Sequence, residues 1–230
     1  MALTVAQDGS ATGASTTPTT SINITEASNQ TLVVFLAVDD SVDQNGTFTY
    51  DSVSMGTAIA ENTSGTGLYC GVWILKNPNS GSALTLSGTI DNSRTWGVIW
   101  AVLNDNDQTT AYDSGTIQTS NSASATTSGV TVSSATNDLV LSFLAVNNKA
   151  EGVISFSGTG QTGFEALTCG ENAMAIEGTY TAGAASVTTA WSWDTGAGKS
   201  EIGIDFNVAA GGGGPSIAAI ARFYEMLRTV

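Results

Sequence analysis

The chain has 230 residues, of which 20 are acidic and 6 are basic, so its net charge is −14 at pH 7. This acidity predicts no binding to nucleic acid or to anionic membranes, because both surfaces repel negative charge. The chain has no histidine, which excludes Ser-His-Asp and Cys-His catalysis and histidine-ligated metals. Only 11% of the residues are charged, and the abundance of Gly, Ser and Thr favours strands and tight turns.

Residues 1–20 are predicted to form an N-terminal arm ahead of the first domain. The first eight residues have neither the basic region nor the apolar region of a secretory signal, and no apolar run is long enough to span a membrane. We therefore expect a protein that is made in a cytoplasm.

Two nearly continuous apolar runs, at residues 32–38 and 139–146, are the clearest strand signals. Such runs are typical of central strands that are covered on both faces. Shorter alternating stretches lie between them, as at residues 48–53, and turn signals such as Asn45-Gly46 separate these stretches. Many short strands with turns at short spacing indicate an all-β fold of the sandwich class.

The two apolar runs belong to a longer self-similarity at a constant offset of 108 residues. At this offset Ile22 corresponds to Val130, and residues 35–38 correspond to residues 143–146. Agreement at one offset over such a span indicates that the chain is an internal duplication.

The sequence therefore predicts two tandem, internally duplicated antiparallel β-sandwich units of a jelly-roll-like kind, plus a short C-terminal α-helix. The first unit covers residues 21–115 and the second covers residues 129–209. Residues 116–128, which are rich in Ser, Thr and Ala, are predicted to be a linker or a surface loop between them.

The final segment, residues 210–230, has a different pattern. Four consecutive glycines and Pro215 predict a flexible hinge that ends where a helix begins. Apolar residues then recur every three or four positions, which is helical spacing. A helix this short needs a surface for its apolar side, so we expect it to pack on its own sandwich or to dock on another subunit. The predicted partner-binding residues are Ile217, Ile220, Phe223, Tyr224 and Leu227.

Two groups of acidic residues are the candidates for a metal site. Calcium takes several oxygen ligands from loops of this kind. Neither group has the spacing of an EF-hand, so solvated acids at strand ends are the alternative interpretation. No other cofactor is indicated. The residues of the calcium hypothesis are Asp39, Asp40, Asp43, Asp105 and Asp107.

No catalytic motif stands out in the chain. Carboxylate pairs at the separation used by glycosidases arise by accident in any acidic sandwich. The Gly-rich stretches have no Lys at the spacing of a phosphate-binding loop. We therefore predict a protein without enzymatic activity.

The cysteines and tryptophans each have two interpretations. Cys70-Gly71 aligns with Cys169-Gly170 in the duplication, and both cysteines are predicted to be small buried residues, with a disulfide as the alternative. The tryptophans could form a sugar-binding face, but four of them lie in strand patterns beside Val, Ile or Ala, which favours core packing. The five are Trp73, Trp96, Trp100, Trp191 and Trp193.

Several stretches of the first unit resemble a β-domain that recurs in virion proteins of tailed phages and in some bacterial surface proteins. The resemblance covers the second unit more loosely, because Thr181-Ala182-Gly183 replaces the Lys-Asn-Pro turn. It implies a fold and roles in capsid decoration or tail-associated binding, and it implies no catalytic residue. The stretches are LVVFLAV at 32–38, FTYDSVSM at 48–55, VWILKNPNSG at 72–81 and WGVIWAVL at 96–103.

The resemblance and the composition together predict a virion structural protein, made in the host cytoplasm. The leading hypothesis is a capsid decoration (cement) protein on the outer surface of a tailed phage. Its expected partners are the major capsid protein or other virion subunits, and further copies of itself, with a trimer by analogy. The second hypothesis is a tail or fibre adhesin that binds host surface glycans. The third is a secreted carbohydrate-binding or glycan-active protein.

Overall fold

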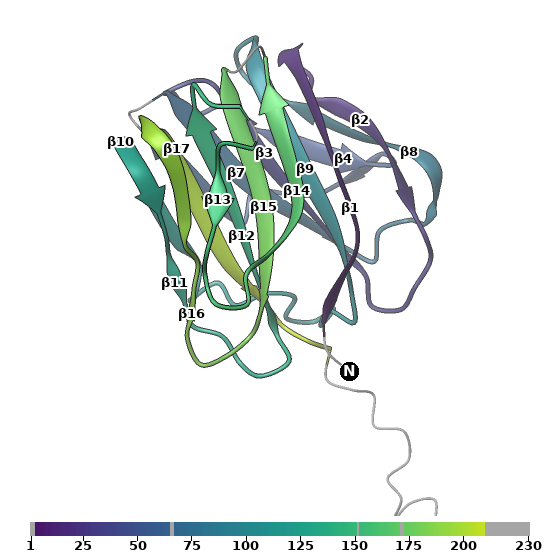
Figure 1. Cartoon of the computed structure of the whole chain (residues 1–230). Coiled ribbons are helices and arrows are strands. Elements are labelled where there is room, and N and C mark those ends of the chain that lie inside the picture. Colours follow the sequence, from purple (N-terminus) through teal and green to yellow (C-terminus); the bar gives the residue numbers. More distant parts are fainter. Residues whose placement is uncertain (1–2, 65–66, 151, 171–172, 210–230) are drawn as a thin grey trace, which may run out of the picture.

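The computed structural model describes residues 3–64, 67–150, 152–170 and 173–209, and every element assigned there is a β-strand (Figure 1). The strands form several antiparallel sheets, which confirms the predicted all-β fold. No helix in these residues could cross a membrane. The predicted hinge and helix at residues 210–230 lie outside the described part of the chain.

The first central sheet has five strands in the order β1-β9-β3-β7-β6. Its middle strand, β3, is hydrogen-bonded along its whole length to β9 on one side and to β7 on the other. The strands are β1 (Thr4–Ser15), β3 (Thr31–Val38), β6 (Ala60–Ser64), β7 (Leu68–Lys76) and β9 (Arg94–Asn104).

The second central sheet has the order β10-β17-β12-β15-β14, and the short strand β13 also pairs with β17. Its middle strand, β12, lies between β17 and β15. The strands are β10 (Gln118–Ser128), β12 (Leu139–Asn147), β13 (Ser155–Phe156), β14 (Thr162–Cys169), β15 (Met174–Ala182) and β17 (Trp191–Phe206).

Two smaller sheets cover the outer faces of the central pair. The order in the larger one is β2-β8-β4-β5, and the smaller one pairs β11 with β16. Side chains of the larger outer sheet pack on the first central sheet, and those of β11 and β16 pack on β12. The strands are β2 (Thr19–Ile24), β4 (Thr47–Tyr50), β5 (Val53–Ser54), β8 (Gly81–Thr89), β11 (Thr131–Val132) and β16 (Val187–Thr188).

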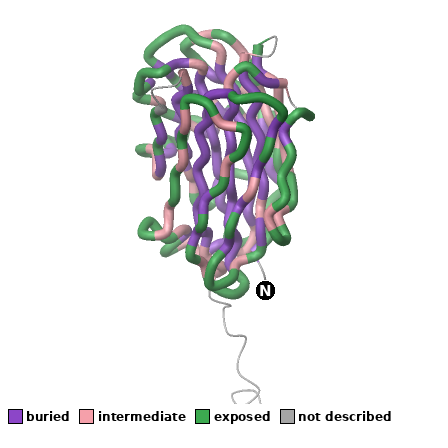
Figure 2. Tube along the Cα trace, turned by 60° about the vertical axis from the view of Figure 1, so that its left-hand side comes forward, coloured by how far each residue is buried: buried purple, intermediate pink, exposed green. Residues whose placement is uncertain are grey.

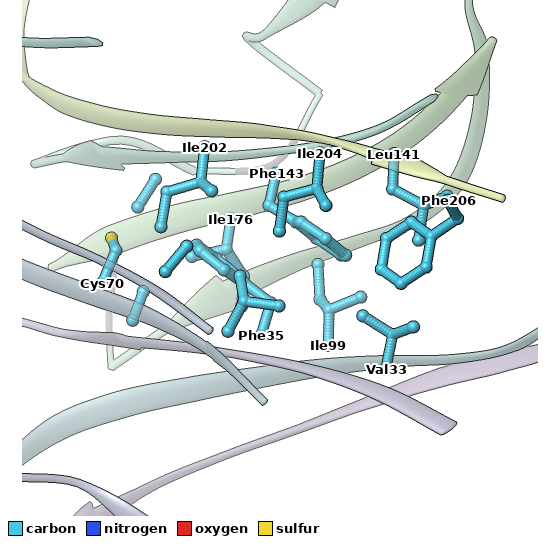
Figure 3. Packing of buried hydrophobic residues seen from close by; sticks show 14 of the residues in the cluster. Val33, Phe35, Cys70, Ile99, Leu141, Phe143, Ile176, Ile202, Ile204 and Phe206 are labelled. Carbon is cyan, nitrogen blue, oxygen red and sulfur yellow. The ribbon is translucent and has the colours of Figure 1, made fainter. Parts of the chain in front are cut away.

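The two central sheets pack face to face around the largest apolar core. Figure 3 shows side chains of both sheets pointing toward one another there, among them Val33 and Ile99 from one sheet and Leu141 and Ile204 from the other. At its centre Phe35 and Phe143 stack, with ring centroids 5.0 Å apart and planes 8° from parallel. Buried strands run through the middle of the body, and exposed residues gather in the loops and outer strands (Figure 2).

Strand β3 is buried on both faces, as its apolar run predicts. Every residue of the strand is buried. Alternate side chains, including Phe35, face the second central sheet, while Val34 and Leu36 face the larger outer sheet. Because a strand turns successive side chains to opposite faces, only an uninterrupted apolar run can supply two cores at once.

The predicted linker at residues 116–128 is instead strand β10 over most of its length, and the predicted arm contains strand β1. Both are edge strands of central sheets, with side chains that are exposed or half-buried. Small polar residues can occupy such exposed positions, so these segments lack the apolar periodicity by which a strand is predicted. Composition alone therefore identified these segments wrongly.

Candidate functional site

The last described residues, 206–209, lie against residues 105–112 of the connection between the two halves. A β-bridge joins Tyr112 to Phe206 in this region. The two segments together are named the C-terminal clamp. They fix the last described residues to the body.

A single buried amide organises the C-terminal clamp. Asn106 has no exposed surface, and its Nδ2 donates hydrogen bonds of 2.8 Å to the carbonyl oxygens of Ala111 and Asn207. Its Oδ1 accepts a hydrogen bond of 2.5 Å from Thr31 Oγ1, at the start of β3. A buried polar group is costly unless its partners are met, so this arrangement ties the exit of the chain rigidly to the first central sheet.

The C-terminal clamp lies at the same end of the molecule as the N-terminus (Figure 1). The backbone N–H of Leu3 donates to Asn137 O at 3.3 Å, which joins the two halves there. The loop after β3, residues 39–46, lies at the opposite end, because β3 runs away from Thr31 toward Val38. The predicted partner-binding residues, Ile217 to Leu227, lie outside the described residues.

The acidic group after β3 is engaged by other protein groups. Asp40 accepts a hydrogen bond from Arg94 Nε at 2.8 Å. Burial raises the pKa of Asp40, but the hydrogen bond and charge of Arg94 outweigh it, so the pKa lies below its usual value. Asp43 accepts the backbone N–H of Asn45 at 3.0 Å, which closes a tight turn. Asp39 lies beside Asp40 and is half-buried.

The second acidic group lies at the other end of the sheet, after β9. Asp107 Oδ1 accepts backbone N–H groups from Thr109, at 2.7 Å, and from Thr110. Asp105 adopts a left-handed backbone with φ of 63°. The two acidic groups therefore lie apart, and the calcium hypothesis concerns each group by itself. Across residues 3–64, 67–150, 152–170 and 173–209, no three acidic or cysteine side chains are arranged to hold a metal ion.

All five tryptophans are buried, which confirms that they serve the core. Trp73 packs against Phe48 in a tilted arrangement with ring centroids 5.0 Å apart, and Trp191 packs edge-on against Phe156 at 6.0 Å. Trp191 and Trp193 point to the same face and share one small core. None of these rings is exposed enough to act as a stacking platform for a sugar.

Both cysteines are buried thiols in the core between the central sheets, so the disulfide alternative is wrong. Burial raises the pKa of Cys70 to about 12, which keeps it protonated. The alignment of Cys70 with Cys169 does not hold in space. Cys70 lies within β7, an inner strand, whereas Cys169 ends the edge strand β14. Two Cys-Gly pairs gave a misleading match.

A buried carboxylate that the sequence analysis did not single out lies in β17. Glu201 has no exposed surface. Its Oε1 accepts hydrogen bonds from Thr189 Oγ1 at 2.6 Å, from Ser142 Oγ at 3.0 Å and from Trp191 Nε1 at 3.0 Å. Its Oε2 accepts one from the hydroxyl of Ser128. Four donors compensate a charge that would otherwise be very costly to bury.

A buried ammonium completes this network. Lys199 is 4% exposed, and its Nζ donates to Ser128 Oγ at 2.8 Å and to the hydroxyl of Ser120. Burial lowers the pKa of Lys199, and the negative charge of Glu201 opposes this shift. Both serines belong to β10, so the network fastens this uncharged edge strand to β17. We name Lys199, Glu201 and their hydroxyl partners the β17 polar network.

The first central sheet carries apolar side chains where its middle strand faces β9. Leu36 of β3 lies opposite Val98, whereas Leu144 of β12 lies opposite Glu201. The outer core of the first sheet is accordingly one cluster, and that of the second is divided into two. Charged residues at alternate positions of an apolar strand, Lys199 and Glu201, were the available sequence signal.

A second buried acid lies near the end of β17. Asp205 is 3% exposed, and its Oδ1 has no hydrogen-bond partner. Burial, followed by the charges of Asp138 and Asp113, raises its pKa to about 6. The ordinary value for Asp is near 4, so this carboxyl changes charge at mildly acidic pH.

A surface groove of about 450 Å³ lies beside the ends of β15 and β16. Hydroxyl groups and small side chains line it, and no charged side chain does. A groove of this kind offers hydrogen bonds to a neutral polar ligand but no charge to an ionic one. The lining residues are Thr159, Gly160, Thr181, Ala182, Ala184, Ser186, Val187 and Thr188.

No known protein family matches this chain, and neither does any curated protein. The assignment of a function therefore has to come from the geometry and the chemistry of the chain itself.

Proposed function

We propose that the protein is a virion structural protein, a decoration protein on the outer capsid surface of a tailed phage, and that it has no enzymatic activity. The observation that carries the proposal is the C-terminal clamp. It gives a rigid all-β body one fixed exit, followed by a glycine hinge and an apolar segment at 210–230. A body of this kind on a flexible anchor suits attachment to a particle.

The internal duplication is part of the proposal. The strand orders β1-β9-β3-β7-β6 and β10-β17-β12-β15-β14 agree position by position, if β3 corresponds to β12, β7 to β15 and β9 to β17. This agreement supports a duplication with an offset of 108 residues at β3. Each half then uses its central sheet to bury the other half, which explains why neither needs a helix for cover.

The nature of the surface supports an inert outer layer. The net charge of −14 favours solubility and resists association with other acidic surfaces. The tryptophans and both cysteines are buried. The expected partners are the major capsid protein and further copies of the chain.

Particle binding tests the proposal directly. Phage particles that lack the protein would be mixed with the purified full chain or with a variant that ends at residue 209, and then sedimented. We expect the full chain to sediment with the particles and the truncated variant to remain in solution. The truncated variant should keep the strand-type circular dichroism and the melting temperature of the full chain.

Point variants distinguish the effect of the predicted apolar side from the effect of shortening the chain. Ile220→Asp places a charge on the predicted apolar side and should reduce binding at least tenfold, whereas Thr229→Asp should not. Equal sedimentation of the truncated and full chains would refute the anchor. Failure of the full chain to bind any particle would refute decoration.

An adhesin that binds host surface glycans is the second candidate, and the hydroxyl-lined groove favours it. Neutral sugars present hydroxyl groups that such a surface can match. A glycan array with the full chain tests this function. Specific binding that is lost in Thr181→Val and Thr188→Val would favour the adhesin over the decoration protein.

A further inference from the structure

The carboxamide of Gln161, next to the groove, is held as a polarised carbonyl. Its Oε1 accepts two backbone hydrogen bonds, from Gly158 N at 3.0 Å and from Ala190 N at 3.1 Å. Two backbone donors on one carbonyl oxygen are the arrangement that stabilises the oxyanion formed when a nucleophile attacks the carbonyl carbon.

A buried hydroxyl lies directly beside this carboxamide. Thr179 is 1% exposed, and its Oγ1 is 3.0 Å from Gln161 Nε2. Gln161 immediately precedes β14, and Gly163 of that strand pairs with Thr179 in the β14–β15 ladder. Reacting groups held this close need no diffusional encounter.

A buried carboxyl group lies on the same strand as Thr179. Glu177 precedes Thr179 by two residues in β15, so both side chains project from the same face. Glu177 is 6% exposed. A carboxylate in this position can take the hydroxyl proton and deliver it to a leaving amine.

From this constellation we propose that the chain forms an internal ester cross-link between Thr179 and Gln161. Thr179 Oγ1 attacks Gln161 Cδ, and the new Oγ1–Cδ bond replaces the Cδ–Nε2 bond. Glu177 carries the hydroxyl proton to the departing nitrogen, which leaves as ammonia. No oxidant, reductant or cofactor enters the reaction. The new bond ties the start of the edge strand β14 to β15.

The groove provides the route by which ammonia leaves. Gly160, which precedes Gln161, and Thr181, which follows Thr179 on the same face of β15, both line it. The product is neutral, as the groove is. The cross-link would leave the backbone hydrogen bonds of the Gln161 carbonyl oxygen in place.

The mass of the purified full chain tests the cross-link. We expect the main species to be lighter than the sequence mass by one ammonia, after allowance for removal of Met1. A glutamate-specific protease cuts after Glu165 and Glu177, between the two linked residues, so it should release a branched peptide pair. Hydroxylamine cleaves esters and should separate the pair.

Variants locate the chemistry. Thr179→Val keeps the shape of the side chain and removes the nucleophile, and Glu177→Gln removes the base, so both should show the full sequence mass. Thr181→Val changes a hydroxyl on the same strand and face and should still lose ammonia. Melting temperatures of all variants establish that each is folded.

Two results would overturn the proposal. One is a folded full chain at the complete sequence mass, which would make Gln161 a loop clamp only. The other is a loss of ammonia that persists in Thr179→Val. The Asn45-Gly46 pair can lose ammonia through a succinimide, and the peptide map distinguishes that product because it is not branched.

Discussion

Lys199 and Glu201 lie on the same face of β17 and share one partner, the hydroxyl of Ser128. This hydroxyl accepts a hydrogen bond from the ammonium and donates one to the carboxylate. Two opposite charges therefore lie inside the second central sheet, whereas the first central sheet carries apolar residues along its middle strand. The pair supports a strand, β10, that has no apolar face of its own. Edge strands with a weak pattern slip in register easily, and fixed polar contacts oppose slippage.

Removal of one charge from the β17 polar network should be strongly destabilising. Lys199→Met leaves the carboxylate of Glu201 buried without a cation, and breaking a buried pair in this way costs about 3–5 kcal/mol. Urea unfolding followed by tryptophan fluorescence measures the loss. The double variant Lys199→Met with Glu201→Leu should recover part of it, because no buried charge remains. Lys76→Met, at an exposed position, serves as the control.

Asp205→Asn should stabilise the protein at pH 8 by about 3 kcal/mol, since a rise of the pKa from the ordinary value to about 6 corresponds to that energy. The folded state binds the proton more tightly than the unfolded state does. The free energy of unfolding therefore rises as the pH falls from about 6 to about 4. Above pH 6 the carboxyl is charged, and its full destabilising effect is present.

Thermal melts of Asp205→Asn and the wild type from pH 4 to pH 8 check this prediction. The difference in melting temperature should be largest at pH 8 and should shrink toward zero at pH 4. Glu26→Gln, at an exposed position, controls for the change in net charge. A difference that does not vary with pH would mean that the carboxyl of Asp205 is not the cause.

Gly9→Ala should loosen the edge strand β1. Gly9 pairs with Trp100 of β9, and a β-carbon at Gly9 would lie 2.6 Å from Trp100 Cζ2. The indole is itself packed in a core, so relief requires a shift of the strand, at a cost of roughly 1–3 kcal/mol. Hydrogen exchange of residues 4–15 should accelerate. Ala14→Ser, at an exposed position of the same strand, should leave exchange unchanged.

Asn106→Ala should open the C-terminal clamp. The variant removes three hydrogen bonds of a buried amide, each worth about 0.5–1.5 kcal/mol, while the carbonyls of Ala111 and Asn207 keep only their backbone N–H donors. We expect faster protease cleavage near residues 207–209, while the core between the central sheets stays protected. Asn92→Ala, in an exposed loop, is the matched control. Unchanged cleavage would show that the backbone bonds of the clamp suffice.

The strands that were predicted well are those whose chemistry is local. The apolar runs at β3 and β12 predict strands that are buried on both faces, and the structure confirms this for both. Strands β1 and β10 were missed because partners from distant sequence, such as Trp100 and Lys199, supply what holds them. An isolated stretch of Ser, Thr, Ala and Gly carries no sign of such partners.

The candidate sites depend on the fold in the same way. The two acidic groups, one with Asp40 and one with Asp107, lie at opposite ends of the first central sheet because one follows β3 and the other follows the antiparallel strand β9. The β17 polar network depends on hydroxyls from three separate segments, and only the fold brings them to Glu201 and Lys199.

The sequence by itself determined the all-β class, the burial of the tryptophans and the central position of the two apolar runs. These properties follow from the alternation and hydrophobicity of consecutive residues, which need no knowledge of distant partners. Only the tertiary structure decided which edge strands complete the sheets, where the two buried charges find compensation, and how the chain leaves its folded body. Each of these depends on contacts between residues far apart in the chain, and the energy of such contacts cannot be read from either segment alone.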